Sequence, residues 1–260
     1  MPPTTVTVAD DAGVRTLTLD RPAALNSFDA GLHADLLQAL DAAADDASVR
    51  CVVLAGAGRA FCAGQDLSEP DAAPGQDLGA LIERRYASLV RRLRSMPVPV
   101  MAAVHGVAAG AGASLALNCD IVVAARSASF IQAFSRIGLV PDTAATWLLP
   151  QSVGRARALG LALLGDRLPA AEAERIGLIW QCVDDTELAA TVRALAARLA
   201  AMPSRALVAT RRAIDAALAA DTEAALRHET DAQRALGHAA DFREGVAAFA
   251  DKRPPVFGDR

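Results

Sequence analysis

The chain of 260 residues is poor in aromatic side chains, which make up only 4% of it. Its core must therefore be built from alanine, leucine and valine, and the hydrophobic fraction of 53% is enough for a sizeable one. Cysteine is also scarce, since the four cysteines are scattered and none forms a C-x-x-C pair. We expect reduced core thiols in a cytoplasmic protein rather than disulfides in a secreted one.

Other features that the sequence lacks argue against further classes of protein. No block of basic residues is present and the net charge is −4, so nucleic acid is not expected as the main partner. No apolar run reaches the roughly 20 residues needed to span a bilayer, and residues 1–4 do not begin a signal peptide. No metal site is expected, because the four histidines are dispersed at His33, His105, His228 and His238.

Short β-type runs alternate with helical patterns in the first half of the chain. Strands separated by helices imply ββα units and a sheet buried on both faces. The second half is almost entirely helical, so we divide the chain into an α/β core over residues 1–200 and a helical region over 201–260. Strands are expected over 14–19, 50–54, 98–104, 120–124 and 179–183, and helices over 32–43, 78–93, 110–118, 188–199, 206–220 and 222–236.

Asp142 is the most informative residue, because it is a lone carboxylate in an apolar or conformationally stiff segment, residues 138–143. Desolvation in such surroundings raises the pKa of a carboxyl from about 3.9 toward the range useful for a general base. The alternative is that Asp142 only caps a helix over residues 144–149, since aspartate is a preferred N-cap residue. Taken alone, the residue favours the capping role, and the rest of the chain reverses that preference.

Two loops rich in small residues follow expected strands, over residues 58–66 and 105–112. Small residues let a ligand approach backbone N–H groups closely, and N–H groups at a helix start are unpaired. One N–H group from each loop would form an oxyanion hole. The alternative is a pair of ordinary tight turns, and neither loop matches a phosphate or dinucleotide motif.

The order of these features, two strand-and-loop units followed by Asp142, resembles the crotonase (enoyl-CoA hydratase/isomerase) superfamily over residues 6–257. The resemblance implies an α/β fold, a crotonase-like spiral of ββα units with a helical C-terminal trimerisation region. It also implies an acyl-CoA thioester as substrate, with coenzyme A as part of that substrate and no separate cofactor. The motifs that carry it lie at residues 21–26, 56–67, 99–106, 119–121, 154–158 and 165–168.

By position, the resemblance assigns the two oxyanion amides to Ala63 and Ala111. Hydratases of the superfamily carry two glutamates where Ser114 and Phe134 stand here, and neither side chain acts as a base at neutral pH. Isomerases of the superfamily carry their carboxylate at the position of Asp142. One base and an oxyanion hole suffice for a 1,3-proton shift, so the sequence predicts a CoA-thioester isomerase rather than a hydratase.

The two residues after Thr143 are predicted to affect which acyl group fits the pocket. The pair that follows it is usually Gly-Gly but is Ala144-Ala145 here, and two extra methyl groups are predicted to crowd the acyl pocket. The predicted acyl pocket thus comprises Ser114, Phe134, Ala144 and Ala145.

Contacts to coenzyme A are also implied by the resemblance. They are assigned to Arg21, Asp66, Phe249 and Lys252, of which Phe249 and Lys252 act from a neighbouring subunit. A homo-oligomer, either a trimer or a dimer of trimers, is therefore expected. The apolar stripe within helix 188–199 and the alanine-rich helices after it offer further surface for such an assembly.

A subgroup of the superfamily resembles the chain more closely, namely the ring-epoxide isomerases of bacterial phenylacetate degradation. These convert ring-1,2-epoxyphenylacetyl-CoA to oxepin-CoA and are similar to Δ3,Δ2-enoyl-CoA isomerases. Two other interpretations stay open: an enoyl-CoA hydratase of broad specificity, and a non-catalytic protein of this fold that binds acyl-CoA or RNA. The segments that resemble the subgroup are residues 130–142, 146–150, 159–166, 177–181 and 241–249.

Overall fold

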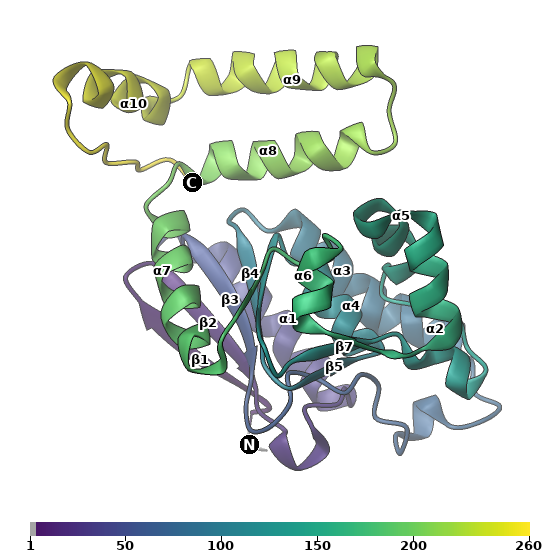
Figure 1. Ribbon diagram of the computed structural model, residues 1–260. Helices are drawn as coiled ribbons and strands as arrows, with labels where there is room; N and C mark the ends of the chain where they lie inside the picture. The colour runs from purple at the N-terminus through teal and green to yellow at the C-terminus, as the bar shows by residue number, and fades with distance from the viewer. Residues whose placement is uncertain (1–3) are drawn as a thin grey trace.

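A computed structural model describes residues 4–260, so the first three residues of the segment tested for a signal peptide lie outside it (Figure 1). The core contains a six-stranded sheet in the order β1-β2-β3-β4-β6-β9, in which only β1 runs antiparallel to its neighbour. A smaller sheet has the order β5-β7-β8. The strands are β1 (Val6–Asp11), β2 (Val14–Leu19), β3 (Cys51–Gly56), β4 (Val100–Val104), β5 (Val107–Ala109), β6 (Ile121–Ala125), β7 (Ser129–Ile131), β8 (Arg167–Pro169) and β9 (Gln181–Val183).

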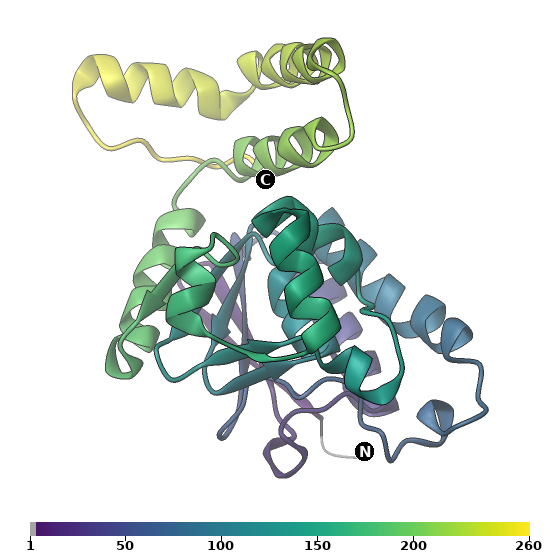
Figure 2. The same ribbon diagram turned by 45° about the vertical axis from the view of Figure 1, so that its right-hand side comes forward.

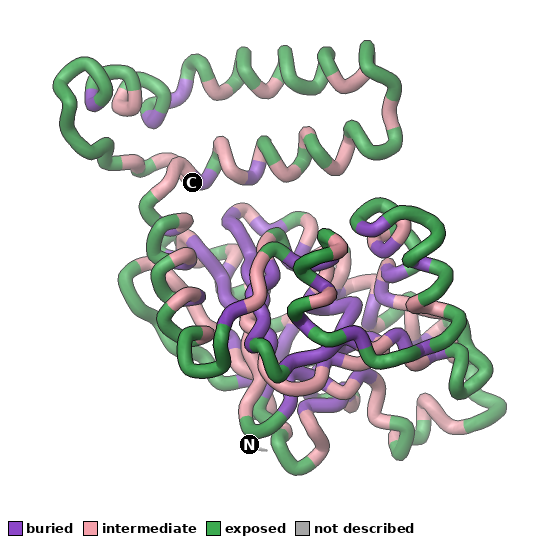
Figure 3. Tube along the Cα trace, in the orientation of Figure 1, coloured by how far each residue is buried: buried purple, intermediate pink, exposed green. Residues whose placement is uncertain are grey.

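Both faces of the central strands β3, β4 and β6 are buried, as the sequence predicted (Figure 3), whereas the edge strand β1 is exposed after Val6. Alternate residues of β3 belong to different cores: Val52 and Leu54 to the larger, Cys51 and Val53 to the smaller. Helices close the larger core, which lies between them and the sheet. These are α1 (Ala30–Asp45), α3 (Ala87–Ser95) and α4 (Ala111–Leu117).

The helix α7 (Leu188–Ala200) closes the smaller core. Val192 and Ala200 are buried in it, and Leu195 and Leu199 pack against it. The expectation that this apolar stripe needs a neighbouring subunit is therefore wrong. A parallel sheet has two apolar faces to cover, and the stripe covers the second one within the same chain.

The C-terminal helices extend away from the core (Figures 1 and 2). The division expected between residues 200 and 201 falls at the end of α7, just before the turn that leads to the next helix. These helices are α8 (Ser204–Ala217), α9 (Thr222–Gly237) and α10 (Ala240–Asp251), and the trace in Figure 3 is mostly exposed there. They expose a set of large apolar side chains: Ile214, Leu218, Leu226, Phe242, Val246 and Phe249.

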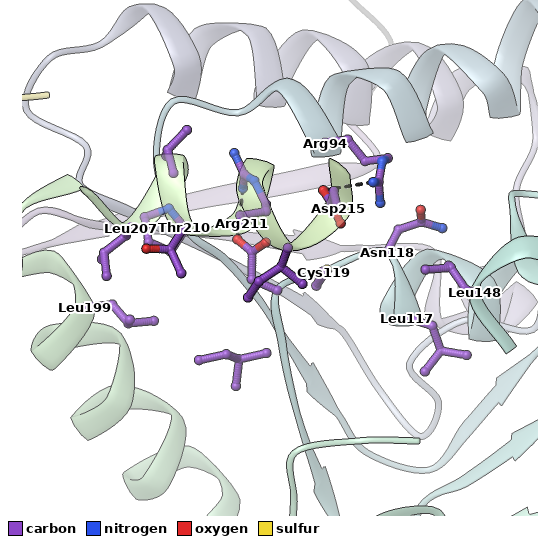
Figure 4. Close-up of a pocket in the computed structure, with 15 residues that line it drawn as sticks. Arg94, Leu117, Asn118, Cys119, Leu148, Leu199, Leu207, Thr210, Arg211 and Asp215 are labelled. Atoms are coloured by element: carbon purple, nitrogen blue, oxygen red, sulfur yellow. Dashed lines mark hydrogen bonds and ion pairs between the residues drawn. The ribbon is translucent and has the colours of Figure 1, made fainter. Parts of the chain in front are cut away.

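Ion pairs join α8 to the core around a cavity of about 460 Å³ (Figure 4). Arg211 donates to the carboxylate of Asp120 at 2.9 Å and to the carbonyl of Met96, and Arg94 pairs with Asp215 at 2.8 Å. Burial raises the pKa of Asp120, and the charge of Arg211 opposes that rise. This junction lies where β4 and β6 begin, at the opposite end of the sheet from the two small-residue loops.

The remaining helices of the core are α5 (Ala145–Leu164), broken at Gly154, α6 (Ala170–Arg175), and α2 (Leu78–Leu81), which continues through a π-turn into α3. Each strand expected from the sequence is present, whereas β1, the three-residue strands β5, β7 and β8, and α10 were not expected individually. Within residues 4–260, no helix combines the length and apolarity that crossing a bilayer requires.

Candidate active site

The two small-residue loops lie side by side at the carboxyl ends of β3 and β4. The Cys62 N–H donates to the Val107 carbonyl at 3.2 Å, and the Cys62 carbonyl accepts from the Ala109 N–H at 2.9 Å. A Cβ on Gly64 would lie 2.8 Å from the Ala109 oxygen, and one on Gly112 would lie 2.3 Å from the Cys62 oxygen. Only glycine fits at both positions, so the loops are nested into one another.

Among the residues of these loops that line an apolar cavity, two have backbone amides that are available to a ligand. The Ala63 N–H donates to the Leu25 carbonyl at 3.0 Å, so the prediction that it forms half of an oxyanion hole is not supported. In contrast, the hydrogen bonds of residues 4–260 include none donated by the N–H of Gln65 or of Ala111. Ala111 begins α4, where N–H groups lack intrahelical acceptors. Gln65 and Ala111 thus replace Ala63 and Ala111 as the candidate pair.

Both amides belong to residues that line a cavity of about 400 Å³. Its walls come from the two loops, from residues 78–86 and from the segment 133–142. Nearly all lining side chains are apolar, and within the described part of the chain only three are polar: Gln65, Tyr86 and Asp142. Such a cavity suits an apolar acyl group held by a few polar contacts.

The carboxylate of Asp142 lines this cavity and does not cap a helix. The helix α5 begins at Ala145, and its N-cap is Ala144, with no side-chain hydrogen bond. Asp142 instead accepts a hydrogen bond from the Thr143 hydroxyl at 2.8 Å, and it forms no ion pair with any residue from 4 to 260. Burial raises its pKa, and the Thr143 hydrogen bond offsets part of that rise.

Of the four residues predicted for the acyl pocket, only Phe134 lines the cavity. Ser114 is buried and its hydroxyl donates to the Gly110 carbonyl at 3.1 Å. Ala144 has a left-handed φ of 63° and Ala145 is fully buried, so their methyl groups do not crowd the cavity. The effect of Ala144 is on the backbone, because alanine is unfavourable at positive φ.

The residues predicted to contact coenzyme A are not gathered in one chain. Arg21 pairs with Asp29 at 2.9 Å and with Asp66 at 3.2 Å, which ties the segment before α1 to the first loop. A phosphate at this place would meet two carboxylates, so the geometry favours a loop-holding role for Arg21 and Asp66. Phe249, with 88% of its surface exposed, and Lys252 lie at the end of α10 and do not line the cavity.

The sequence analysis did not assign a role in the site to Tyr86, which lines the cavity, or to His33, which packs against Tyr86. The Tyr86 hydroxyl donates to Oε1 of Gln65 at 2.7 Å, and the Tyr86 ring packs edge-on against His33. Burial, with a smaller effect of Arg85, lowers the pKa of His33 to about 3, so this ring is neutral. The available signal was composition: Tyr86 is the single tyrosine of the chain, within a segment that otherwise reads as a core helix.

Comparison with known proteins agrees with this geometry. The family model described as enoyl-CoA hydratase/isomerase matches residues 9–260. The chain belongs to the enoyl-CoA hydratase/isomerase family. Members of this family act on CoA thioesters, and a cavity with two free amides is the part of the structure that suits a thioester carbonyl.

Individual family members give the range of similarity. The 1,2-epoxyphenylacetyl-CoA isomerase of Escherichia coli K12 is 52% identical over 250 residues, covering 95% of each chain. A probable enoyl-CoA hydratase of Rhodobacter capsulatus is 49% identical over 248 residues, again covering 95% of each. The crystal structure of a putative enoyl-CoA hydratase/isomerase from Mycobacterium abscessus has a TM-score of 0.92 at 37% identity, covering 98% of this chain and all of the other. These neighbours establish the fold of this family member, the crotonase fold.

Proposed function

We propose that this family member is a CoA-thioester isomerase in which Asp142 is the single catalytic base. Asp142 takes a proton from C2 of a 3-enoyl thioester, and the electron pair moves into the thioester carbonyl. The N–H groups of Gln65 and Ala111 stabilise the resulting enolate oxygen. Return of the proton at C4 then yields the conjugated 2-enoyl thioester, so that no atom is gained or lost.

The observation that carries the proposal is the environment of Asp142. Its carboxylate has no ion-pair partner among residues 4–260, and it does not cap α5. Asp142 lines an apolar cavity together with the two residues whose amides are free. A hydratase needs a second acid or base to place water. Among the described residues, Asp142 is the only carboxylate that lines the cavity, and Phe134 supplies an apolar ring at one of the two positions concerned.

The names of the relatives support two candidate activities. Similarity to the E. coli protein, named 1,2-epoxyphenylacetyl-CoA isomerase, favours a ring-epoxidised arylacetyl thioester. The Rhodobacter relative is named a probable enoyl-CoA hydratase, which keeps water addition as the second candidate. We further propose a cytoplasmic homo-oligomer, a trimer or dimer of trimers, because α8–α10 expose apolar side chains that the chain itself leaves uncovered.

The test compares two reactions in wild type and in Asp142→Asn. Wild type is expected to convert 3-hexenoyl-CoA to the conjugated 2-enoyl thioester, followed by absorbance, and to hydrate crotonyl-CoA very slowly. Asp142→Asn should bind CoA esters and lose isomerisation by at least about 10²-fold, the usual contribution of a general base. Near-normal isomerisation by the variant would show that the base lies elsewhere, and rapid hydration by wild type would favour the hydratase.

A further inference from the structure

A π-turn interrupts the helix that forms one wall of the cavity. The turn spans Ile82–Tyr86, between α2 and α3. Single π-turns inside α-helices are rare and occur frequently at functional sites. Leu81, Ile82 and Tyr86 line the cavity, so this turn sets which side chains of the helix meet the acyl group.

The Gln65 amide sets the direction of the hydrogen bond that the Tyr86 hydroxyl makes in the structure. The Nε2 group of Gln65 donates to the Asp66 carbonyl at 3.1 Å. Because a carbonyl only accepts, the amide nitrogen must face it, which leaves Oε1 toward Tyr86. The phenol therefore donates its proton to Gln65 at 2.7 Å, and no group within residues 4–260 donates to its lone pairs.

The Tyr86 ring is also held from behind. Its centroid lies 4.4 Å from that of His33 at an interplanar angle of 87°, and 5.7 Å from that of Phe28 at 74°. Phe28 and His33 stack on one another at 4.5 Å. Tyr86 is 1% exposed, so its ring cannot change orientation without disturbing this cluster. A polar group held in this way is preorganised for recognition.

We propose that Tyr86 is a specificity-determining residue whose phenolic oxygen hydrogen-bonds an oxygen atom carried by the acyl group of the substrate. A hydroxyl on the acyl group donates to this oxygen, and a ring ether draws the Tyr86 proton away from Gln65. The preferred substrates are then oxygen-bearing cyclic acyl thioesters rather than plain alkyl ones. This inference rests on the proposed function, because it concerns the same cavity.

The composition of the cavity leaves this task to Tyr86. Within the described residues the other polar lining side chains are Asp142, assigned to proton transfer, and Gln65, whose amide is engaged at both ends. Burial raises the pKa of Tyr86 most, and the negative charge of Asp142 raises it further. The phenol therefore stays protonated at neutral pH. Tyr86 is thus a neutral polar group in the same cavity as Asp142.

Two stable ligands that differ by one oxygen test the inference. Phenylacetyl-CoA and 2-hydroxyphenylacetyl-CoA are titrated calorimetrically into wild type, Tyr86→Phe and Ile82→Val. Wild type should bind the hydroxylated ligand about five- to tenfold more tightly, the usual value of one net hydrogen bond. Tyr86→Phe keeps the ring and should lower that ratio to about one. Ile82→Val alters an apolar side chain on the same wall of the cavity and removes no polar group, so it should leave the affinity ratio as in wild type.

A spectroscopic measurement gives an independent reading. Since Tyr86 is the only tyrosine, 3-fluorotyrosine labelling yields a single ¹⁹F resonance for this position. Saturation with 2-hydroxyphenylacetyl-CoA should shift this resonance further than saturation with phenylacetyl-CoA. Equal shifts, together with equal affinities in wild type, would overturn the inference.

The remaining outcomes separate this inference from the proposed function. Equal weakening of both ligands by Tyr86→Phe would mean that the hydroxyl only holds the first loop in place, and the inference would be wrong. If wild type isomerises 3-hexenoyl-CoA but does not prefer the hydroxylated ligand, the inference alone is overturned. If wild type hydrates crotonyl-CoA rapidly, or if Asp142→Asn isomerises as fast as wild type, the proposed function fails, whatever the binding ratio.

Discussion

The Thr143 hydroxyl donates a 2.8 Å hydrogen bond to the carboxylate of Asp142, its neighbour in the chain. Thr143 is buried and has a φ of 53°, a left-handed value that a β-branched residue rarely adopts. The chain thus holds a strained residue next to the proposed base. Such strain persists only where the surrounding structure enforces it, and it concentrates at functional sites.

The pH dependence of isomerisation should reflect this pair. A general base works only when deprotonated, so the rate should fall as pH is lowered through the pKa of Asp142. Because burial raises that pKa, the acid limb of kcat/KM should lie above the value of about 3.9 for a free aspartate. Thr143→Val removes the donor that favours the charged form and should move the limb to higher pH. Thr143→Ser keeps the hydroxyl and serves as the control, so equal limbs in the two variants would contradict this role.

Ala144 is expected to lower the free energy of unfolding through its backbone conformation. Its φ of 63° favours glycine, so Ala144→Gly should stabilise the protein by about 0.5–1 kcal/mol, after the entropy cost of glycine is subtracted. Thermal unfolding would show this as a higher Tm. The neighbouring change Ala145→Gly is the control, because Ala145 is buried in the first turn of α5 and its loss should cost about 1 kcal/mol. A lower Tm for Ala144→Gly would refute the strain argument.

His33 should make the fold sensitive to acid. Its pKa is lowered to about 3 in the folded state, from about 6.5 in an unfolded chain. Its stabilising effect is therefore complete above pH 6.5 and is lost as the pH falls toward 3, by up to about 1.4 kcal/mol per pH unit. His33→Phe keeps a ring against Phe28 and Tyr86 and should move the acid unfolding midpoint to lower pH. An unchanged midpoint, measured by circular dichroism, would show that other groups control acid unfolding.

Lys252 should report on assembly, because it is the only lysine in the sequence. An amine-selective reagent then labels only this side chain and the N-terminal amine. If Lys252 contacts coenzyme A from a neighbouring subunit, an acyl-CoA should protect it in a trimer or hexamer seen by light scattering. Lys252→Ala should raise KM more than it lowers kcat, and Lys252→Arg should restore KM. A stable monomer at micromolar concentration would contradict this arrangement.

The sequence predicted the architecture better than the details of the site. Sequence pattern located the parallel strands of the main sheet, because strands buried on both faces are apolar runs and the half-buried strand β2 alternates apolar and polar residues. Strands of three residues, such as β5, carry too little pattern to be recognised. The π-turn ending at Tyr86 was also missed, since the helical pattern on either side of it continues without a break.

The errors in the site have one physical origin. Position along the chain assigned an oxyanion amide to Ala63, but whether an amide is free depends on its acceptor, and Leu25 lies 38 positions earlier. Ala144 was likewise assigned to the pocket by its place after Asp142. Its dihedral angle, which the sequence does not show, directs its influence to the backbone instead. Asp142, chosen because it is an isolated carboxylate in an apolar segment, does line the cavity, and its role as the base stays a prediction.

The nesting of the two loops limits how the protein can be recombined with its relatives. Gly64 meets the backbone of the second loop, and Gly112 meets the backbone of the first. A crossover between residues 66 and 105 would join loops that have not been shaped against each other. Chimeras that exchange residues 58–112 as one block should therefore fold more often than those that exchange either loop alone.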